Sequence, residues 1–396
     1  IFSKAYGSAN LEWDVPNTPD TKFRLGSLTK QFTAAAVLLL EERGKVKLDD
    51  PIKTYYPDAP PAWDAITLRH LLGHTSGIPN YTATPDFGRM SATHSTPADL
   101  VQRVANLPLE FQPGAQMRYS NTGYVLLGMV IEKASGGGYA AFLKQNFFEP
   151  LGMKDTGYDV NALILPKRAS GYTPGPNGIA NANYVDMTTP FSAGALYSTA
   201  ADLLRWERAL FGGKVVSPAS FEKMTTQGKG NYGMGLFIEV DAGHRVIGHG
   251  GGIPGFNSRL AHLPDSDITV VALSNLNGPG SDAIAQKLGL LAQGDKVVLM
   301  PERKSIQVPI AVLQKYVGDY DFDGTRVLKV TLEDGQLFCQ VTGDGKFPIA
   351  PETPTRFFPL PFEAQFEFKT DKKGKVTGML SHQGSEEKFV RRLVSK

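Results

Sequence analysis

The chain has 396 residues, with 41 lysines and arginines against 39 aspartates and glutamates, and 41% of its residues are hydrophobic. This near-neutral charge, with no dense basic stripe, argues against nucleic-acid binding, and the longest apolar run, about seven residues, is far too short to span a membrane. A single cysteine, Cys339, excludes an intrachain disulfide and a cluster of thiolate metal ligands. The composition therefore indicates a globular protein with a large core and two or three domains.

The first part of the chain leads into a strongly predicted helix. The chain begins with Ile1 in an extended segment rather than with methionine, so we expect a processed or trimmed start. Apolar residues recur at helical spacing from Leu28 to Leu40, which predicts a helix. Ser27 occupies the expected N-cap position of this helix, and Gly44 is expected to end it.

The pattern of the following residues predicts a mixed domain. Helices are expected over 67–72, 97–106, 123–134, 199–211, 217–225 and 280–292. Strands of an antiparallel meander are expected over 234–240, 244–249, 256–263 and 268–275. Helices around an antiparallel sheet indicate an α+β domain, which we assign to residues 1–292.

The end of the chain differs in kind. Residues 293–309 contain two prolines and are interpreted as a linker. Residues 310–396 alternate between apolar and polar residues in short runs separated by dipeptides typical of hairpin turns, and these features predict a small all-β barrel or sandwich. The dipeptides are Asp323-Gly324, Asp334-Gly335, Asp344-Gly345 and Lys373-Gly374.

Ser27-Leu28-Thr29-Lys30 is the main candidate for chemistry. Side chains three apart on a helix share a face, so the Lys30 amine is expected to reach the Ser27 hydroxyl and to activate it as a nucleophile. The same Ser-x-x-Lys pattern occurs at Ser220 and Ser385, but neither opens a long apolar helix. The alternative interpretation of Ser27 is a plain N-cap.

Two further stretches carry polar residues suited to the same chemistry. Tyr119-Ser120-Asn121 immediately precedes the helix over 123–134. Tyr119 suits a proton relay, and Asn121 suits a hydrogen bond to Lys30 or to a substrate carbonyl. The alternative for this stretch is a turn in which Asn121 caps the helix.

The other stretch is His249-Gly250-Gly251-Gly252, which ends the strand over 244–249. Glycine at this place lets a ligand lie against the backbone. The backbone N–H groups of Gly252 and Ser27 are expected to form a pair of oxyanion donors. The alternative is a glycine-rich hairpin with an incidental histidine.

No cofactor or metal is expected from the remaining motifs. Two G-x-G-x-x-G matches, over 228–233 and 250–255, do not follow a strand and open a helix, which argues against a dinucleotide site. His70 and His74 are four residues apart, but the chain has no H-E-x-x-H sequence, which argues against a zinc site.

Taken in order, Ser27-x-x-Lys30, Tyr119-x-Asn121 and His249-x-Gly251 resemble the three motifs of the serine β-lactamase and penicillin-binding-protein superfamily. The Tyr-x-Asn form resembles its class C-like branch, with the D,D-carboxypeptidases, D-aminopeptidases and family VIII carboxylesterases. Stretches 71–79, 193–198 and 255–258 strengthen the match. The resemblance covers roughly residues 1–292, and the tail is similar to the lipocalin-like β modules of some members.

This resemblance implies an α/β sandwich of the β-lactamase/transpeptidase type with an all-helical subdomain. It implies that Ser27 is the acylated nucleophile, Lys30 its activating partner and Tyr119 the group that moves the proton. Asn121, His249, Gly251 and Gly252 are expected to bind substrate. Whether Lys30 or Tyr119 is the acylation base stays open. A periplasmic or secreted protein is expected, with the cytoplasm not excluded.

His249 is a departure from the β-lactamase pattern, which has lysine there. A lysine supplies a permanent cation for a substrate carboxylate, whereas histidine is largely neutral near pH 7. We therefore expect a serine hydrolase acting on carboxylic esters or on D-amino-acid peptides and amides. The alternatives are a class C-type β-lactamase and a non-catalytic binder of penicillin or peptide. The oligomeric state is left open.

Overall fold

The computed structural model describes residues 1–175, 178–297, 303–324, 326–342, 346–359, 364–383 and 386–393. They form two compact units, of which the first comprises Ile1–Gly175 and Ile179–Val297 and the second contains the described residues from 303 onward. The predicted turn Asp344-Gly345 and the serine at position 385 lie outside the described residues.

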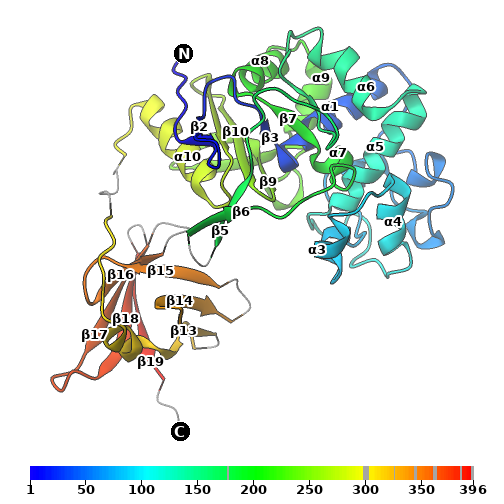
Figure 1. The fold of residues 1–396 in the computed structure, drawn as a ribbon. Coiled ribbons are helices and arrows are strands. Elements are labelled where there is room, and N and C mark those ends of the chain that lie inside the picture. Colours follow the sequence, from blue (N-terminus) through cyan, green and yellow to red (C-terminus); the bar gives the residue numbers. More distant parts are fainter. Residues whose placement is uncertain are drawn as a thin grey trace. The chain divides into compact units, whose positions relative to one another are not determined.

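The first unit is built on a four-stranded antiparallel sheet with the order β11-β10-β9-β8. Its strands β9 and β10 are labelled in Figure 1. Its strands are β8 (Phe237–Asp241), β9 (His244–Ile253), β10 (Phe256–Leu263) and β11 (Ile268–Ser274). The predicted meander is confirmed, but β9 does not end at His249. It continues through the glycines because Gly252 and Gly251 pair with Asn257 and Ser258 of β10.

Both faces of this sheet are covered, as the alternation of side chains on a strand requires. Val246 and Ala261 belong to a small apolar cluster with Ala285 of α10, whereas Ile247 and Leu260 belong to the main core. The helices of the first unit are α1 (Thr29–Glu42), α2 (Leu68–Leu72), α3 (Phe87–Met90), α4 (Pro97–Ala105), α5 (Asn121–Ser135), α6 (Tyr139–Leu143), α7 (Phe191–Gly194), α8 (Ala200–Phe211), α9 (Pro218–Thr225) and α10 (Gly280–Gln293).

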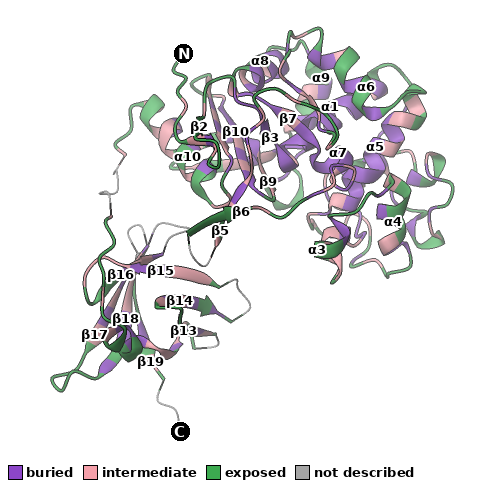
Figure 2. Ribbon diagram, in the orientation of Figure 1, coloured by how far each residue is buried: buried purple, intermediate pink, exposed green. Residues whose placement is uncertain are grey.

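Helix α1 is the buried centre of the unit. Its residues from Thr29 to Leu38 are all buried, and α1 packs against α5 of the helical subdomain (Figure 2). The main core accordingly joins the sheet to the helical subdomain around α2 to α6. The short strands along residues 1–200 are β1 (Ser8–Asn10), β2 (Val15–Pro16), β3 (Phe23–Arg24), β4 (Gly157–Tyr158), β5 (Tyr172–Gly175), β6 (Gly178–Asn181) and β7 (Leu196–Ser198).

The second unit confirms the predicted barrel, because strands β12 to β19 close on themselves through pairing of β12 with β19. A short helix, α11 (Ile310–Leu313), precedes the barrel. At the β13–β14 hairpin, Asp334 and Gly335 have φ values of 48° and 82°, as a tight two-residue turn requires. The strands are β12 (Gly318–Asp321), β13 (Val327–Glu333), β14 (Gln336–Val341), β15 (Phe347–Pro351), β16 (Arg356–Pro359), β17 (Gln365–Thr370), β18 (Val376–Gln383) and β19 (Glu386–Arg392).

In the described part of the chain, every helix is too short or too polar to cross a lipid bilayer.

Glu207 in α8 is a buried acid that the fold leaves unpaired. Its side chain is 0% exposed, and neither carboxyl oxygen has a hydrogen-bond partner among the described residues. Burial raises the pKa of Glu207 from 4.5 to about 8. The folded state therefore retains a proton that the unfolded chain releases above pH 4.5, so the free energy of unfolding falls as pH rises between these two values.

We therefore expect Glu207→Gln to stabilise the protein at alkaline pH. Glutamine keeps the shape of the protonated acid, so the gain is expected to be on the order of 3 kcal/mol near pH 9 and close to zero near pH 4. Urea unfolding of the wild type and the variant at both pH values measures the difference. Glu222→Gln, at an exposed position of α9, is the control and should keep the wild-type pH dependence. If the free energy of unfolding changed with pH equally in Glu207→Gln and in the wild type, Glu207 would not hold a buried proton.

Candidate active site

Ser27 lies in a 3-10 turn, Gly26–Leu28, that precedes α1 and packs against β9. The expectation that Ser27 caps the helix is wrong, because α1 starts at Thr29 and its N-cap residue is Leu28. The turn is forced by Gly26, whose φ is +55° and whose missing Cβ would lie 2.8 Å from the carbonyl oxygen of Gly252. The Ser27 hydroxyl is thereby freed from a capping role and lies half-buried beside strand β9.

The Lys30 amine lies one turn along, as the spacing predicted. Its Nζ is 3.0 Å from Ser27 Oγ, 2.8 Å from Asn121 Oδ1 and 2.8 Å from the carbonyl oxygen of Ala193. Lys30 is 0% exposed, and burial holds the pKa of its amine well below the usual 10.5. The structure thus brings together a hydroxyl and an amine that is readily deprotonated.

Tyr119 lies against the same amine, with Lys30 Nζ 4.8 Å from the centroid of its ring. Its hydroxyl oxygen is buried. No group in the described part of the chain lies at a distance and angle that make a hydrogen bond with it. Burial is the main cause of a raised pKa for the Tyr119 phenol, and the adjacent Ser27 hydroxyl acts in the opposite direction. Tyr119 is therefore a protonated phenol beside the candidate nucleophile.

Tyr119 packs against His74, which the sequence marked as part of the stretch 71–79 but to which it gave no role in the site. The two rings pack at a tilt of 35° with centroids 4.2 Å apart, and His74 Nδ1 accepts a hydrogen bond from the Ser120 N–H at 3.2 Å. His74 is 2% exposed, and burial holds its pKa well below 6.5. Its φ of +55°, strained for a residue with a side chain, marks a conformation that the surrounding packing imposes.

Asn121 is the first residue of α5 and does not cap it, since the N-cap residue is Ser120. Its backbone N–H donates to Asn80 Oδ1 at 3.1 Å, and its Nδ2 donates to Thr82 Oγ1 at 3.2 Å. These two contacts aim Oδ1 at Lys30. Asn80 and Thr82 were not predicted from the sequence, because they are polar loop residues separated from Asn121 by about forty positions and no spacing signal marks them.

His249 reaches the same region from β9 but faces inward. It is 2% exposed, with Nε2 3.1 Å from the Tyr232 hydroxyl and Nδ1 against the carbonyl oxygen of Gly250. Burial, and then the charge of Lys30, lowers the pKa of His249 to about 3. The His249 side chain of the third motif is therefore uncharged. Both of its ring nitrogens contact protein groups.

Gly252 is exposed and borders a hollow of about 390 Å³. The hollow is lined by Thr173, Ala182, Asn183, Gly252, Ile253, Pro254 and Asn277. Asn277 organises the turn at its edge, because its Nδ2 donates to the carbonyl oxygens of Ile253 and Phe256. Space for a substrate thus exists next to the backbone N–H that is expected to act as an oxyanion donor.

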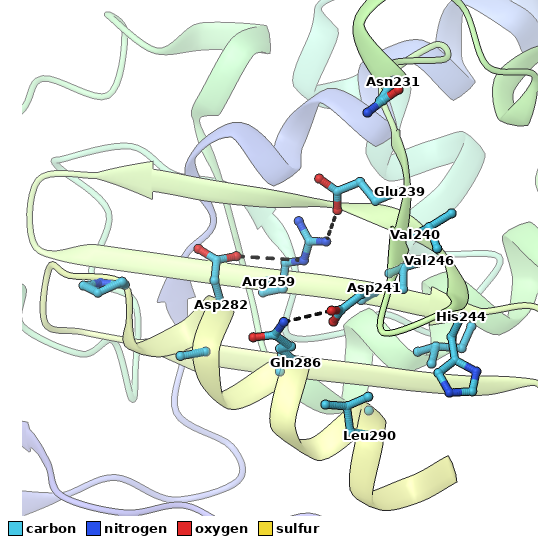
Figure 3. A pocket seen from close by; sticks show the side chains of 16 residues that line it. Asn231, Glu239, Val240, Asp241, His244, Val246, Arg259, Asp282, Gln286 and Leu290 are labelled. Carbon is cyan, nitrogen blue, oxygen red and sulfur yellow. Dashed lines mark hydrogen bonds and ion pairs between the residues drawn. The ribbon is translucent and has the colours of Figure 1, made fainter. Parts of the chain in front are cut away.

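A larger hollow of about 650 Å³ lies elsewhere, between strands β8 to β10 and helix α10 (Figure 3). Arg259 lies within it, with NH2 2.7 Å from Glu239 and Nε 3.9 Å from Asp282. Ser27 and Lys30 are outside its described lining. These two residues are also outside the described lining of the 390 Å³ hollow, which meets the site at Gly252.

Gly251 is needed for the approach of β9 to the segment that carries Ser27. A Cβ at Gly251 would lie 1.9 Å from the Leu25 carbonyl oxygen, which already accepts a hydrogen bond from Ser258 Oγ at 2.7 Å. At Gly252 the nearest atom to an added Cβ, Asn257 Nδ2, is 3.5 Å away. Adjacent glycines therefore differ sharply in the space that they have.

We expect Gly251→Ala to destabilise the protein by about 3 kcal/mol or more, because the methyl group must displace backbone rather than a flexible side chain. Gly252→Ala, the matched control, is expected to change stability by less than about 1 kcal/mol. Denaturant unfolding of both variants measures the contrast. Similar stabilities for the two variants would show that β9 and the Leu25 segment are not packed as described.

The family model described as "Beta-lactamase" matches residues 1–294, and one described as "Domain of unknown function (DUF3471)" matches residues 302–391. The chain is similar to "Penicillin-binding protein 4*" of Bacillus subtilis (strain 168), with 30% identity over 99% of this chain and 92% of that protein.

Two solved structures illustrate the structural likeness. The octameric penicillin-binding protein homologue from Pyrococcus abyssi has a TM-score of 0.68 and 26% identity, covering 99% of this chain and 93% of that one. The D-amino acid amidase from Ochrobactrum anthropi SV3 has a TM-score of 0.66 and 28% identity, covering 73% of this chain and 89% of that one. With the β-lactamase-type fold and the family match together, the chain belongs to the beta-lactamase family and is a serine hydrolase of that superfamily.

Proposed function

We propose that this hydrolase cleaves esters or amides of small carboxylic acids, D-amino-acid derivatives among them, through an acyl-enzyme on Ser27. The observation that carries the proposal is the triple contact of Lys30 Nζ with Ser27 Oγ, Asn121 Oδ1 and the Ala193 carbonyl oxygen. These three contacts match the two N–H groups and the one lone pair of an uncharged amine.

A neutral amine has two N–H donors and one lone pair. Asn121 Oδ1 and the Ala193 carbonyl oxygen can only accept hydrogen bonds, so they take the two N–H groups. The lone pair is then left for the Ser27 hydroxyl, which donates to it. Because burial favours the uncharged amine, Lys30 is set up as the base that removes the Ser27 proton.

The remaining groups fit the later steps of acyl transfer. Ser27 Oγ forms a bond to the substrate carbonyl carbon while its proton passes to Lys30 Nζ, and the carbonyl oxygen gains negative charge. The backbone N–H groups of Ser27 and Gly252 are proposed to stabilise that charge. Tyr119, a protonated phenol, delivers a proton to the leaving oxygen or nitrogen as its bond to carbon breaks, and is reprotonated from Lys30. Water then hydrolyses the ester on Ser27.

The substrate class is proposed from two kinds of support. One relative in the comparison is a D-amino acid amidase, and another is named a penicillin-binding protein. His249 is neutral and buried where a cation would pair with a substrate carboxylate, which favours uncharged esters and amides over β-lactams. We therefore rank carboxylesters and D-amino-acid amides ahead of penicillins as substrates that are turned over.

The test is covalent trapping followed by a substrate panel. A p-nitrophenyl ester and a labelled penicillin are incubated with the full chain, and the adduct is located by mass spectrometry; modification is expected on Ser27. Turnover of short-chain esters, D-amino-acid amides, D-Ala-D-Ala peptides and nitrocefin is then compared at equal enzyme concentration. A folded sample in which neither reagent modifies Ser27 would overturn the proposal, and stable acylation without turnover would identify a penicillin binder instead.

A further inference from the structure

Tyr232 is a buried tyrosine that the proposed reaction does not use. It is 0% exposed and lies in the segment between α9 and β8, where its hydroxyl is 3.1 Å from His249 Nε2. Its ring meets the His249 ring edge to face, with centroids 5.8 Å apart, and lies 4.7 Å from the ring of His74. The contact is thus made by two fully enclosed side chains rather than by mobile surface groups.

The direction of this hydrogen bond follows from the other side of the imidazole. His249 Nδ1 faces the carbonyl oxygen of Gly250, which can only accept, so Nδ1 carries the ring proton. In the neutral ring, Nε2 is then an acceptor, and the Tyr232 hydroxyl donates to it. Tyr124 also lies beside Tyr232, and because its own proton is donated to the Leu72 carbonyl oxygen, its oxygen is a second acceptor next to the Tyr232 hydroxyl. Of these two acceptors, His249 Nε2 is the one at a clear hydrogen-bond distance, 3.1 Å.

We propose that Tyr232 is a positioning residue that locks His249 in its neutral Nδ1–H form and thereby makes the site select substrates without a carboxylate next to the scissile bond. The proposal rests on the hydrolase function proposed above and names the substrate class of the same site. By occupying Nε2, Tyr232 keeps a proton off the imidazole nitrogen that is not already donating, so the buried ring adds no positive charge that would attract a substrate carboxylate toward Ser27.

The charged and titratable groups around His249 also favour its uncharged form. Burial is the largest cause that keeps the imidazole uncharged; Arg259 of β10 opposes a positive charge on it, and so does Lys30 of α1 whenever its amine is protonated. Tyr119, His74 and Tyr232 face it as neutral groups whose burial opposes ionisation. Every one of the seven residues that line the 390 Å³ hollow beside Gly252 is also uncharged. A carboxylate therefore meets no compensating charge in the described lining of this hollow.

The loop before β8 holds Tyr232 in place. The Tyr232 carbonyl oxygen accepts from the Gly228 N–H at 2.8 Å, and Tyr232 pairs with Phe237 in an isolated β-bridge. Within this loop Gly230 has a φ of +64°, and Met117 packs against it, so that an added Cβ would lie 3.0 Å from Met117. The hydroxyl is thus directed by backbone contacts as well as by ring packing.

The first test needs no substitution. Histidine labelled with nitrogen-15 is incorporated into the full chain, and the imidazole shifts are measured from about pH 5 to about pH 8, a range over which an unperturbed histidine titrates. The seven histidines are assigned by single substitution. His249 is expected to show a protonated Nδ1 and an unprotonated Nε2 throughout. A proton on Nε2 in the wild type would overturn the proposal.

The second test uses two aryl esters of phenylacetylglycine that differ only in a meta-carboxylate on the leaving phenol. In the wild type, the ratio of kcat/KM for the carboxylate ester to that for the neutral ester is expected to be flat with pH. Tyr232→Phe removes the donated hydrogen bond that stabilises the neutral imidazole, so the pKa of His249 rises. In this variant we expect the ratio to increase by about tenfold toward pH 5, mainly through KM.

Tyr139→Phe is the matched control, because Tyr139 is an equally buried tyrosine whose hydroxyl is 2.7 Å from Thr33 Oγ1 rather than from a histidine. It should leave both the ratio and the His249 shifts as in the wild type. A Tyr232→Phe variant that is folded but has an unchanged ratio and unchanged shifts would overturn the proposal. If Ser27 is not acylated by either reagent, the hydrolase function fails, whereas the histidine shifts still report on the tautomer.

Discussion

If Ser27 is the nucleophile, Ser27→Ala is expected to lower kcat by about 10⁵-fold or more, the order of the loss when the nucleophilic serine of a serine protease is removed. The methyl group leaves the 3-10 turn at Gly26–Leu28 intact, because the turn depends on Gly26 and on the contact with β9 rather than on the hydroxyl. Substrate binding and thermal stability are therefore expected to stay close to those of the wild type. Initial rates with a p-nitrophenyl ester, together with a binding measurement on the same variant, provide the check.

Ser220→Ala is the control for this result, because Ser220 begins the same Ser-x-x-Lys pattern in α9. In α9 the lysine amine does not pair with the serine, because Lys223 Nζ lies 2.8 Å from a carboxylate oxygen of Glu41. Ser220 lies in the first turn of a helix capped by Ser217. Activity of Ser220→Ala should equal that of the wild type. Residual turnover of Ser27→Ala above about one per cent of the wild type would point to another nucleophile, since no water-activated route is expected to be that fast.

Lys30→Met is expected to lower kcat by about 10³- to 10⁴-fold, because the Ser27 proton loses its acceptor. Lys30→Arg separates a base from a cation: the guanidinium stays charged and cannot accept a proton, so this variant should be as inactive as Lys30→Met. Substantial activity in Lys30→Arg would show that position 30 contributes positive charge rather than proton removal. Circular dichroism of both variants establishes that they are folded.

The pH profile of the wild type tests the same point without a substitution. The pKa of Lys30 lies well below 10.5 because its amine is buried, and the amine must be uncharged to act as a base. Activity is therefore expected to fall as pH falls through this lowered pKa and to be constant above it until other groups ionise. The dependence of kcat/KM on pH gives the pKa in the free enzyme. A profile that rises only near pH 10 would assign the amine an ordinary pKa.

Periodicity and turn chemistry predicted much of the fold from local residues. The helical apolar spacing from Leu28 to Leu40 predicted α1, and Asp323-Gly324 and Asp334-Gly335 predicted two hairpins of the barrel, because both signals act within a few residues of the chain. The end of β9 was missed. Glycines weaken a strand by themselves, but here β10 pairs with them and extends the strand to Ile253.

The cluster of reactive residues was predictable as a set, because Ser27, Lys30, Tyr119 and Asn121 occur in a recognisable order. The residues that position this cluster could not be predicted from the sequence. Asn80 and Thr82, which aim Asn121, and Tyr232, which binds His249, are separated from their partners by 17 to 41 positions and share no periodicity with them. Contacts of this kind arise only when packing brings distant loops together.

The amino-acid sequence alone determined which side chains are present and which local elements carry them: a hydroxyl and an amine one helical turn apart, and a histidine on a glycine-rich strand. Only the tertiary structure decided their chemical state. An amine donates or accepts, and an imidazole is charged or neutral, according to burial and to the partners around it. For Lys30 and His249 these are the enclosed core, two carbonyl acceptors and the Tyr232 hydroxyl.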